Sequence, residues 1–95
     1  MSSNLPSGHT VLFENDKVRV LDVRIPPGET SEMHTHPDSF VYALSSANVV
    51  FSFPDGTSRN VHITEGDGNW NNAMTHEVKN IGDTLDWGII FELKK

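Results

Sequence analysis

Apolar and polar residues alternate along most of the chain, a pattern that predicts short β-strands. Val18–Ile25 is rich in β-branched residues and stops at Pro26-Pro27-Gly28, where a strand has to end and the chain has to turn. Residues 49–63 predict a hairpin, because two alternating runs flank the strong turn sequence PDGT. The last predicted strand, Leu85–Leu93, carries large apolar side chains at every second position: Trp87, Ile89, Phe91 and Leu93.

No segment longer than a few residues shows the helical period. Turn signals recur about every eight to twelve residues, which is typical of a β-barrel or a β-sandwich. We therefore predict an all-β fold, a small antiparallel β-barrel or jelly roll. The length of 95 residues fits one domain. We place this barrel domain at residues 10–95, with residues 1–9 as an N-terminal tail or an edge strand.

Composition excludes several classes of function. The net charge of −6, from 7 basic and 13 acidic residues, argues against binding of nucleic acid or of an anionic membrane surface. The sequence has no cysteine, which excludes disulfides, zinc–thiolate sites and cysteine nucleophiles. The sequence shows neither signal-peptide features nor an apolar stretch of membrane-spanning length, so we expect a cytoplasmic protein.

The apolar residues, 36% of the chain, are few for the core of an independent domain of this size. The apolar segment Trp87–Leu93 lies near the C-terminus, and we expect it at an edge of a sheet with unpaired backbone groups. Two-fold association would cover such an edge, so we expect a homodimer.

Three of the five histidines stand in segments that predict strands: His34, His36 and His76. Because side chains alternate along a strand, His34 and His36 share a face, with Cα atoms about 7 Å apart. Two imidazoles at this spacing can bind one metal ion, and His76 is the candidate third ligand. A surface histidine pair is the plain alternative, since a His-x-His sequence alone is common. His9, in the N-terminal segment, and His62 are expected to lie outside any site.

The sequence around the first two histidines resembles the first motif of the cupin superfamily, G(X)5HXH(X)3,4E(X)6G. Gly28, His34 and His36 match this motif in residue type and spacing. Phe40 stands where the motif has its glutamate, and no glycine closes the motif. With Phe40 in place of the glutamate, the predicted site lacks one of the four usual ligands of a cupin metal site.

The region around His76 resembles the second motif of the same superfamily, G(X)5PXG(X)2H(X)3N. Gly66, His76 and Asn80 match it, with the motif's spacing of three between the histidine and the asparagine. Asn72 and Met74 replace its proline and second glycine, and the gap before the histidine is one residue shorter. The two motifs together imply a cupin barrel.

Loss of the glutamate makes the predicted site similar to that of the three-histidine cupins. That group includes the acetylacetone (β-diketone) dioxygenases and, more distantly, cysteine dioxygenase. The resemblance implies one divalent transition metal on His34, His36 and His76, with iron favoured and zinc, nickel, manganese and copper left open. Three neutral imidazoles leave the ion its full charge, which favours anionic, chelating oxygen ligands.

Two functions follow from this interpretation. The first is a non-haem iron dioxygenase or a related lyase acting on a small oxygen-chelating, β-dicarbonyl-like metabolite, with Tyr42 and Glu32 as candidate catalytic residues. The second is a module that binds or senses a small carboxylate on the metal without turnover. A structural barrel with relic histidines and no metal is a third interpretation.

Four residues are candidates for the pocket wall: Phe40, Leu44, Trp70 and Met74. Phe40, Tyr42 and Leu44 alternate after the first motif, so they share the face of His34 and His36 if that alternation continues past the intervening proline. Core packing is the plain interpretation of these side chains. In the functional interpretation, Phe40 withholds negative charge from the metal and keeps the pocket dry.

Overall fold

The computed structural model describes residues 5–94, which contain nine strands and no helix. The strands are β1 (His9–Glu14), β2 (Val18–Ile25), β3 (Thr30–His36), β4 (Ser39–Ala43), β5 (Ala47–Ser52), β6 (Ser58–Ile63), β7 (Gly68–Asn71), β8 (Met74–Asn80) and β9 (Asp86–Leu93). Within this range no helix is long and apolar enough to cross a membrane. The all-β prediction is confirmed, and the first strand begins at His9, inside the segment for which the sequence left tail and edge strand open.

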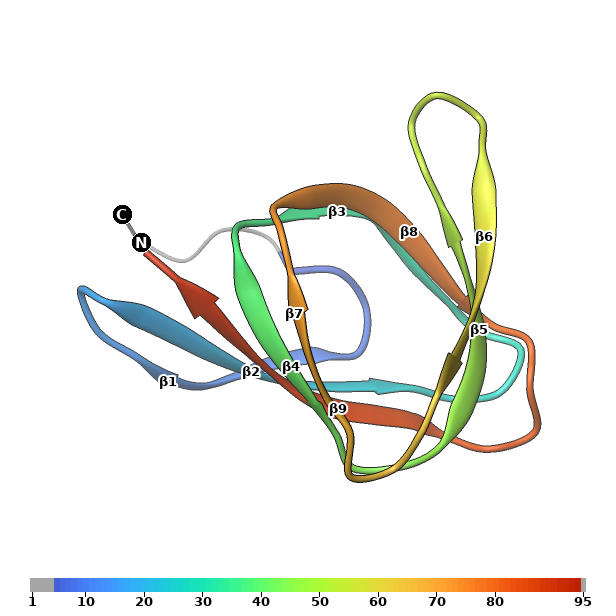
Figure 1. Cartoon of the computed structure of the whole chain (residues 1–95), viewed down its shortest axis with the longest axis horizontal. Helices are drawn as coiled ribbons and strands as arrows, with labels where there is room; N and C mark the ends of the chain where they lie inside the picture. The colour runs from blue at the N-terminus through green and yellow to red at the C-terminus, as the bar shows by residue number, and fades with distance from the viewer. Residues whose placement is uncertain (1–4, 95) are drawn as a thin grey trace.

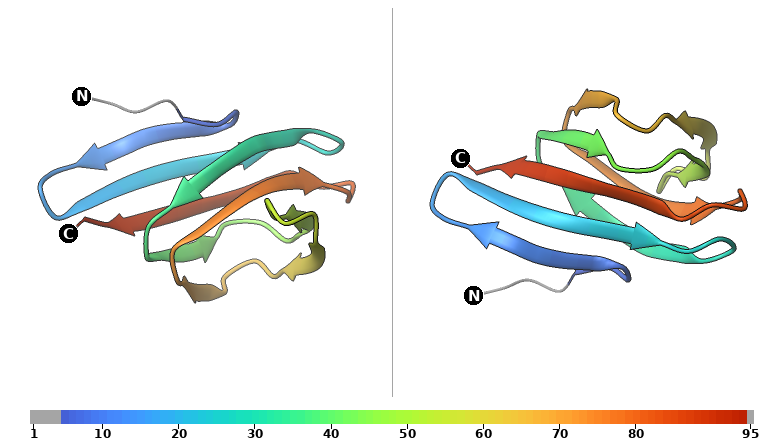
Figure 2. Two further views of the ribbon diagram at one scale, coloured as in Figure 1. Left: turned by 90° about the horizontal axis from the view of Figure 1, so that it is seen from above. Right: turned by 90° about the horizontal axis from the view of Figure 1, so that it is seen from below.

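The strands form two antiparallel sheets that face each other. One sheet has the order β1-β2-β9-β4-β7 and the other the order β3-β8-β5-β6. The chain passes repeatedly from one sheet to the other, as it does in a jelly roll (Figure 1). Figure 2 shows β1, β2 and β9 side by side in one layer. The predicted hairpin is confirmed, because β5 pairs with β6 along its whole length.

A small hydrophobic core lies between the sheets. Leu21 of β2 and Val49 of β5 are completely buried. Burying a side chain of this size stabilises the fold by about 1.5–3 kcal/mol. The other buried members of the core cluster are Val23, Ile25, Ala47 and Val78.

The predicted motif residues Gly28 and Asn80 meet at one end of the barrel. Gly28 has a φ of 82°, a left-handed conformation that favours glycine, and its N–H donates a hydrogen bond to the carbonyl of Asn80. The fully buried side chain of Asn80 donates to the carbonyls of Ile25 and Thr84 and accepts from the N–H of Gly82. Asn80 therefore ties the end of β2 to the turn between β8 and β9.

The last strand, β9, lies in the middle of its sheet, between β2 and β4. The prediction that Trp87–Leu93 forms an exposed edge is therefore wrong. The edges of this sheet are β1 and β7. The apolar side chains of β9 at odd positions do not face the core either. Glu92 is buried, whereas Phe91 and Leu93 are partly exposed on the outer face.

An apolar row crosses the outer face of the five-stranded sheet from edge to edge. Directly opposed pairs connect its members strand by strand: Phe13, Val20, Phe91, Phe40 and Trp70. We call these residues the outer row. Phe13 and Trp70 are more than half exposed, and the Phe40 and Phe91 rings lie 6.3 Å apart. Side chains this apolar on an open sheet face are a feature of interaction surfaces.

Candidate metal centre

Two of the predicted ligands are direct cross-strand partners. His34 on β3 lies opposite His76 on β8, and their ring centroids are 4.8 Å apart. The pairing of β3 with β8 is irregular between Ser31 and His34, where β3 has one residue more than β8. This bulge turns Glu32 outward while Ser31 and His34 both face the interior.

The third predicted ligand, His36, lies two residues further along β3 and is buried. Its ring centroid is 4.5 Å from that of His34 and 5.7 Å from that of His76. Its Nδ1 donates a hydrogen bond to the carboxylate of Glu92, which leaves Nε2 as the atom with a free lone pair. A carboxylate on the far nitrogen fixes the tautomer of a metal-binding histidine and raises its basicity.

Glu92 is the buried carboxylate of this site, and the sequence analysis missed it. Its side chain is 2% exposed, and it accepts hydrogen bonds from His36 and, at 2.8 Å, from Nε of Arg19. Burial opposes its ionisation, but the hydrogen bonds from His36 and Arg19 hold its pKa below the ordinary value. Glu92 is the Cα partner of Ser39, one residue before the position of the missing motif glutamate.

His9 also belongs to the cluster, so the prediction that it lies outside the site is wrong. It is the first residue of β1 and lies opposite Val23, whose side chain faces the interior. Its ring centroid is 5.2 Å from that of His34 and 5.8 Å from that of His36. Gly8 makes this placement possible, because a Cβ at Gly8 would come within 2.2 Å of the Arg24 carbonyl oxygen.

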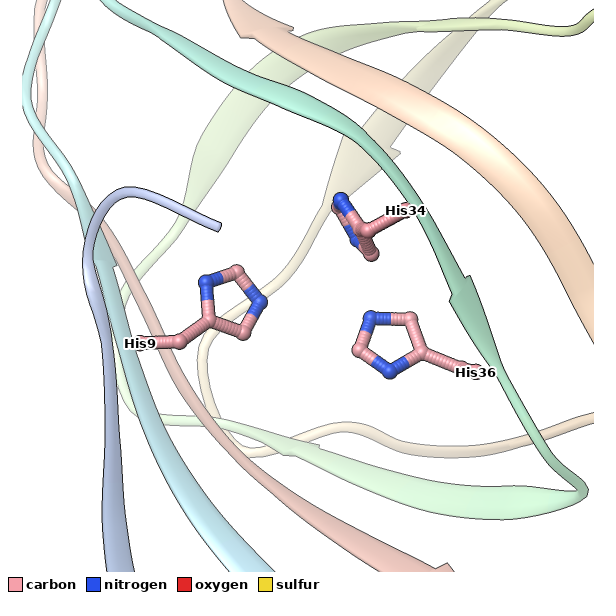
Figure 3. Close-up of side chains that lie close together, drawn as sticks. All are labelled: His9, His34 and His36. Atoms are coloured by element: carbon pink, nitrogen blue, oxygen red, sulfur yellow. The ribbon is translucent and has the colours of Figure 1, made fainter. Parts of the chain in front are cut away.

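The ring nitrogens of this cluster are arranged as ligands. One ligand atom each of His9, His34 and His36 lies within 4.8 Å of the other two, and the three rings face one common space (Figure 3). The Nε2 of His34 and the Nδ1 of His76 are buried without a hydrogen-bond partner. Burying a ring nitrogen without a hydrogen-bond partner destabilises the folded protein, and coordination of a metal ion would offset that cost. His9, His34 and His36 therefore fit one divalent ion, and His76, which is outside that 4.8 Å group, lies beside it against the rings of His34 and His36.

Three of the histidines, His9, His34 and His76, have lowered pKa values that favour the neutral form, which binds metal. Burial lowers the pKa of His9 to about 4 and that of His76 to about 3, and the other histidines lower both further. Burial also lowers the pKa of His34. Neutral imidazoles at neutral pH need no proton release before they coordinate a metal.

The cluster forms part of the wall of an interior cavity of about 100 Å³. Apolar side chains make up most of the remaining wall, among them Phe51, Met74 and Ile90. The ring of Phe51 packs edge-on against His76, with 4.5 Å between the centroids. A volume of this kind takes roughly seven to ten water molecules, so the cavity suits a small metabolite.

Phe40 and Tyr42 do not line this cavity, and the expectation that they share a face with the histidines is wrong. The two side chains are 40% and 41% exposed on the outer face of β4. The physical reason is the crossing at Pro37, since β3 belongs to one sheet and β4 to the other. Alternation cannot be continued across that crossing. The ring of Phe40 instead covers Gly68, where an added Cβ would lie 2.4 Å from it.

The other predicted residues are divided between the interior and the surface. Met74 lines the cavity, whereas Leu44 and Trp70 do not. Leu44 follows the end of β4, and Trp70 is 53% exposed in the outer row. Glu32 is exposed, and its carboxylate accepts hydrogen bonds from the N–H and the hydroxyl of Ser7, which lower its pKa to about 2. Neither Glu32 nor Tyr42 is placed to act on a ligand in the cavity.

His62 lies apart from the cluster, as the sequence analysis expected. It is exposed on β6, and its ring contacts the side-chain oxygen of Asn48 at 2.7 Å. It therefore offers a matched histidine outside the site for experiments on metal binding.

Neither a protein-family model nor a curated protein sequence matches the chain. The structure is similar to a cupin domain from Bordetella pertussis Tohama I, with a TM-score of 0.84 and 27% identity over 100% of this chain and 99% of that one. It is also similar to an RmlC-like cupin family protein with a double-stranded β-helix fold from Methanocaldococcus jannaschii, with a TM-score of 0.70 and 14% identity over 90% and 78% of the two chains. A structure of oxalate decarboxylase matches with a TM-score of 0.62 and 28% identity, over 83% of this chain but 22% of that one.

The jelly-roll fold and the inward-facing histidine cluster define a cupin with a candidate metal centre. The chain has the fold of cupin domains, as its two motifs predict.

Proposed function

We propose that the protein binds one divalent transition metal ion on His9, His34, His36 and His76 and uses it to hold a small oxygen-chelating ligand. The observation that carries this proposal is the cluster itself, in which buried ring nitrogens without hydrogen-bond partners lie at the wall of an apolar cavity. When bound, such an ion supplies Lewis acidity, and iron also supplies redox chemistry.

The chain's own residues determine the class of ligand. Neutral imidazoles leave the positive charge of the ion uncompensated, and the nearest buried carboxylate, Glu92, is already paired with His36 and Arg19. An anionic oxygen ligand such as an enolate or a carboxylate supplies the missing negative charge. The apolar wall, including Phe51 and Met74, excludes water from that ligand.

The activity that we propose is that of an iron-dependent dioxygenase, or of a related lyase, acting on a β-dicarbonyl-like metabolite. The support for it is the resemblance to three-histidine cupins together with the apolar wall of the cavity beside the histidines. The histidine cluster orients the chelating oxygens, and Glu92 holds the ring of His36 in the orientation that exposes its free nitrogen.

A second candidate is a binding or sensing module without turnover, and two observations favour it. The predicted catalytic residues Tyr42 and Glu32 lie outside the cavity. Four histidines around one ion would leave fewer open positions than three, which would suit a chelating ligand better than a chelating ligand together with dioxygen.

Oxygen uptake by the iron-loaded protein separates the two candidates. With a panel of β-dicarbonyl compounds, the dioxygenase is expected to consume oxygen in proportion to substrate, and His36→Ala is expected to abolish the uptake. Ligand binding detected by calorimetry without any oxygen uptake would establish the module instead. Iron that binds neither ligand nor oxygen would contradict both.

We also propose that a second copy of the chain covers the outer row. The face spans five strands, about 19 Å at the usual strand spacing, and the eight residues of β9 extend it about 26 Å along the strands. Two such faces in contact bury about 1,000 Å², which is near the minimum for a specific interface. Contact of sheet faces thus replaces the edge pairing that the sequence led us to expect.

A further inference from the structure

One carboxyl group in the cavity has no role in the site described so far. Asp86 is the first residue of β9 and faces the interior opposite Ile25. It lies six positions before Glu92 on the same inward-facing side, about 20 Å along an extended strand. Asp86 therefore stands at the end of the cavity remote from the pair formed by Glu92 and His36.

The interior cavity and a groove between β6 and β7 meet at Asp86. The groove has a volume of about 470 Å³ and is open to the outside between the edge strands of the two sheets. Six residues belong to both walls: Val41, Phe51, Ile63, Asn71, Asp86 and Gly88. Asp86 is the charged member of this set, so its carboxyl group lies where the cavity and the groove adjoin.

Asp86 has no partner within the part of the chain that the structure describes. No group in residues 5–94 donates a hydrogen bond to its carboxylate, and burial alone raises its pKa to about 6. Asp86 is partly buried, and a carboxylate that loses part of its water without gaining a donor is less stable in its charged form. Groups that lower stability in a cleft in this way are candidates for ligand recognition.

We propose that Asp86 is the second anchor of the ligand site, where its carboxyl group accepts a hydrogen bond from an ammonium or hydroxyl group at the end of the ligand remote from the metal. This inference rests on the metal-dependent ligand binding proposed above. It narrows the ligand class to short, mostly apolar molecules of roughly seven to ten non-hydrogen atoms, with chelating oxygens at one end and a hydrogen-bond donor at the other.

The test uses the cobalt-loaded protein at pH 8 and three series of straight-chain hydroxamates with one to four methylenes. The three series differ in the group at the end of the chain remote from the hydroxamate, which is an ammonium, a hydroxyl or a methyl group. The visible spectrum of the cobalt reports binding. At one length the wild type is expected to bind a donor-ended member about tenfold or more tightly than its methyl isostere. The length of greatest preference measures the span from metal to carboxyl, and the better donor identifies the group recognised.

Two variants decide whether Asp86 causes the preference. In Asp86→Leu the preference is expected to fall below twofold, while the affinities for the methyl series and for cobalt stay unchanged. The matched control is Asp67→Leu, which changes an exposed acidic residue of the outer groove and is expected to keep the preference. A wild type without preference at any length, or a preference that persists in Asp86→Leu, would overturn the proposal.

A second measurement separates this proposal from the metal site. In the metal-free protein, simple n-alkylamines and n-alcohols are expected to shift the NMR signals of Asp86 and Gly88, and Asp86→Leu is expected to abolish that shift. Failure to bind cobalt with these shifts present would refute the proposed metal function and leave the anchor standing. Cobalt binding with no shift from either kind of compound would refute the anchor alone.

Discussion

The two faces of the five-stranded sheet differ in a way that local sequence hides. The outer face carries the large apolar side chains of the outer row. The inner face of β9 carries Asp86, Gly88, Ile90 and Glu92, two of which are acidic. A rule that places apolar residues inside therefore predicts the wrong face of β9 as the buried one.

The two faces also differ in the kinds of side chain that they carry. The interior contains groups that are unfavourable to bury, such as Glu92 and the histidines of the candidate metal centre. The exterior contains aromatic side chains that bury little area in a single chain and would bury more in the proposed dimer. The stability of the fold thus depends on few core residues. Both the site and the outer face depart from the usual distribution, in which polar residues are exposed and apolar residues are buried.

The two faces are expected to differ most in how much stability is lost when residues 91 and 92, which are adjacent on β9, are substituted. Glu92→Ala removes the buried carboxylate that contacts both Arg19 and His36, so we expect the unfolding free energy to fall by about 3–5 kcal/mol. Phe91→Ala on the outer face is expected to lower it by about 1 kcal/mol in the monomer. Urea titrations of both variants at low concentration measure this contrast. Equal losses would contradict the assignment of the two faces.

The next effect concerns the pH dependence of stability. The pKa of Asp86 is about 6 in the folded protein against an ordinary value of 3.8, so its protonated form is the one that the fold favours. Protonated Asp86 therefore contributes to the unfolding free energy below about pH 4. This contribution, at most about 3 kcal/mol, is lost as the pH rises through 6. Burial is the cause of the raised pKa, and Arg59 and Asp67 are the charged groups of the adjoining groove that face this side of β9.

Asp86→Asn removes this titration, so the variant should gain stability relative to the wild type between pH 4 and pH 7. Thermal or urea unfolding at several pH values gives the difference between the two proteins. A constant difference across that range would show that Asp86 titrates normally.

A smaller effect is expected from the outer row on assembly. Trp70→Ser combined with Phe91→Ser removes the centre and one end of the proposed interface, and it is expected to shift the protein to a monomer. Light scattering over a hundredfold range of concentration should show association of the wild type only. Met33→Ser changes an exposed apolar residue of the other sheet and serves as the control. A wild type that stays monomeric at every concentration would contradict the dimer.

The smallest expected effect is that of Phe40→Glu on metal binding. Because Phe40 points outward, the new carboxylate cannot reach the histidines, and the affinity for manganese should stay within about twofold of the wild type. Calorimetric titration measures it. A large gain in affinity would place this side chain inside the barrel after all.

The sequence predicted those features that depend on neighbours along one strand. His34 and His36 share the inner face of β3, and the hairpin of β5 and β6 forms at the predicted turn. Both follow from alternation and from turn chemistry within a few residues. Gly28 and Asn80 were recognised from motifs, and the structure supplies their physical reason in the backbone turn and the buried amide.

The features that were missed depend on pairing between distant strands. His9 reaches the cluster because β1 pairs with β2, and Glu92 reaches His36 across 56 residues. A bulge in β3 turned Glu32 outward, and the crossing after His36 reversed the face of Phe40. One signal was available in the sequence: Glu92 interrupts an apolar strand, and a charged residue in such a place is often paired.

The most direct test of this account is the metal content of protein purified without added metal. We predict about one divalent transition metal ion per chain in the wild type and a great reduction in His34→Ala, His36→Ala and His76→Ala. His9→Ala should also lose metal, because His9 lies with these rings, whereas His62→Ala should retain it. A wild type that carries no metal and takes up none on titration, or equal metal in His36→Ala and His62→Ala, would contradict the metal centre.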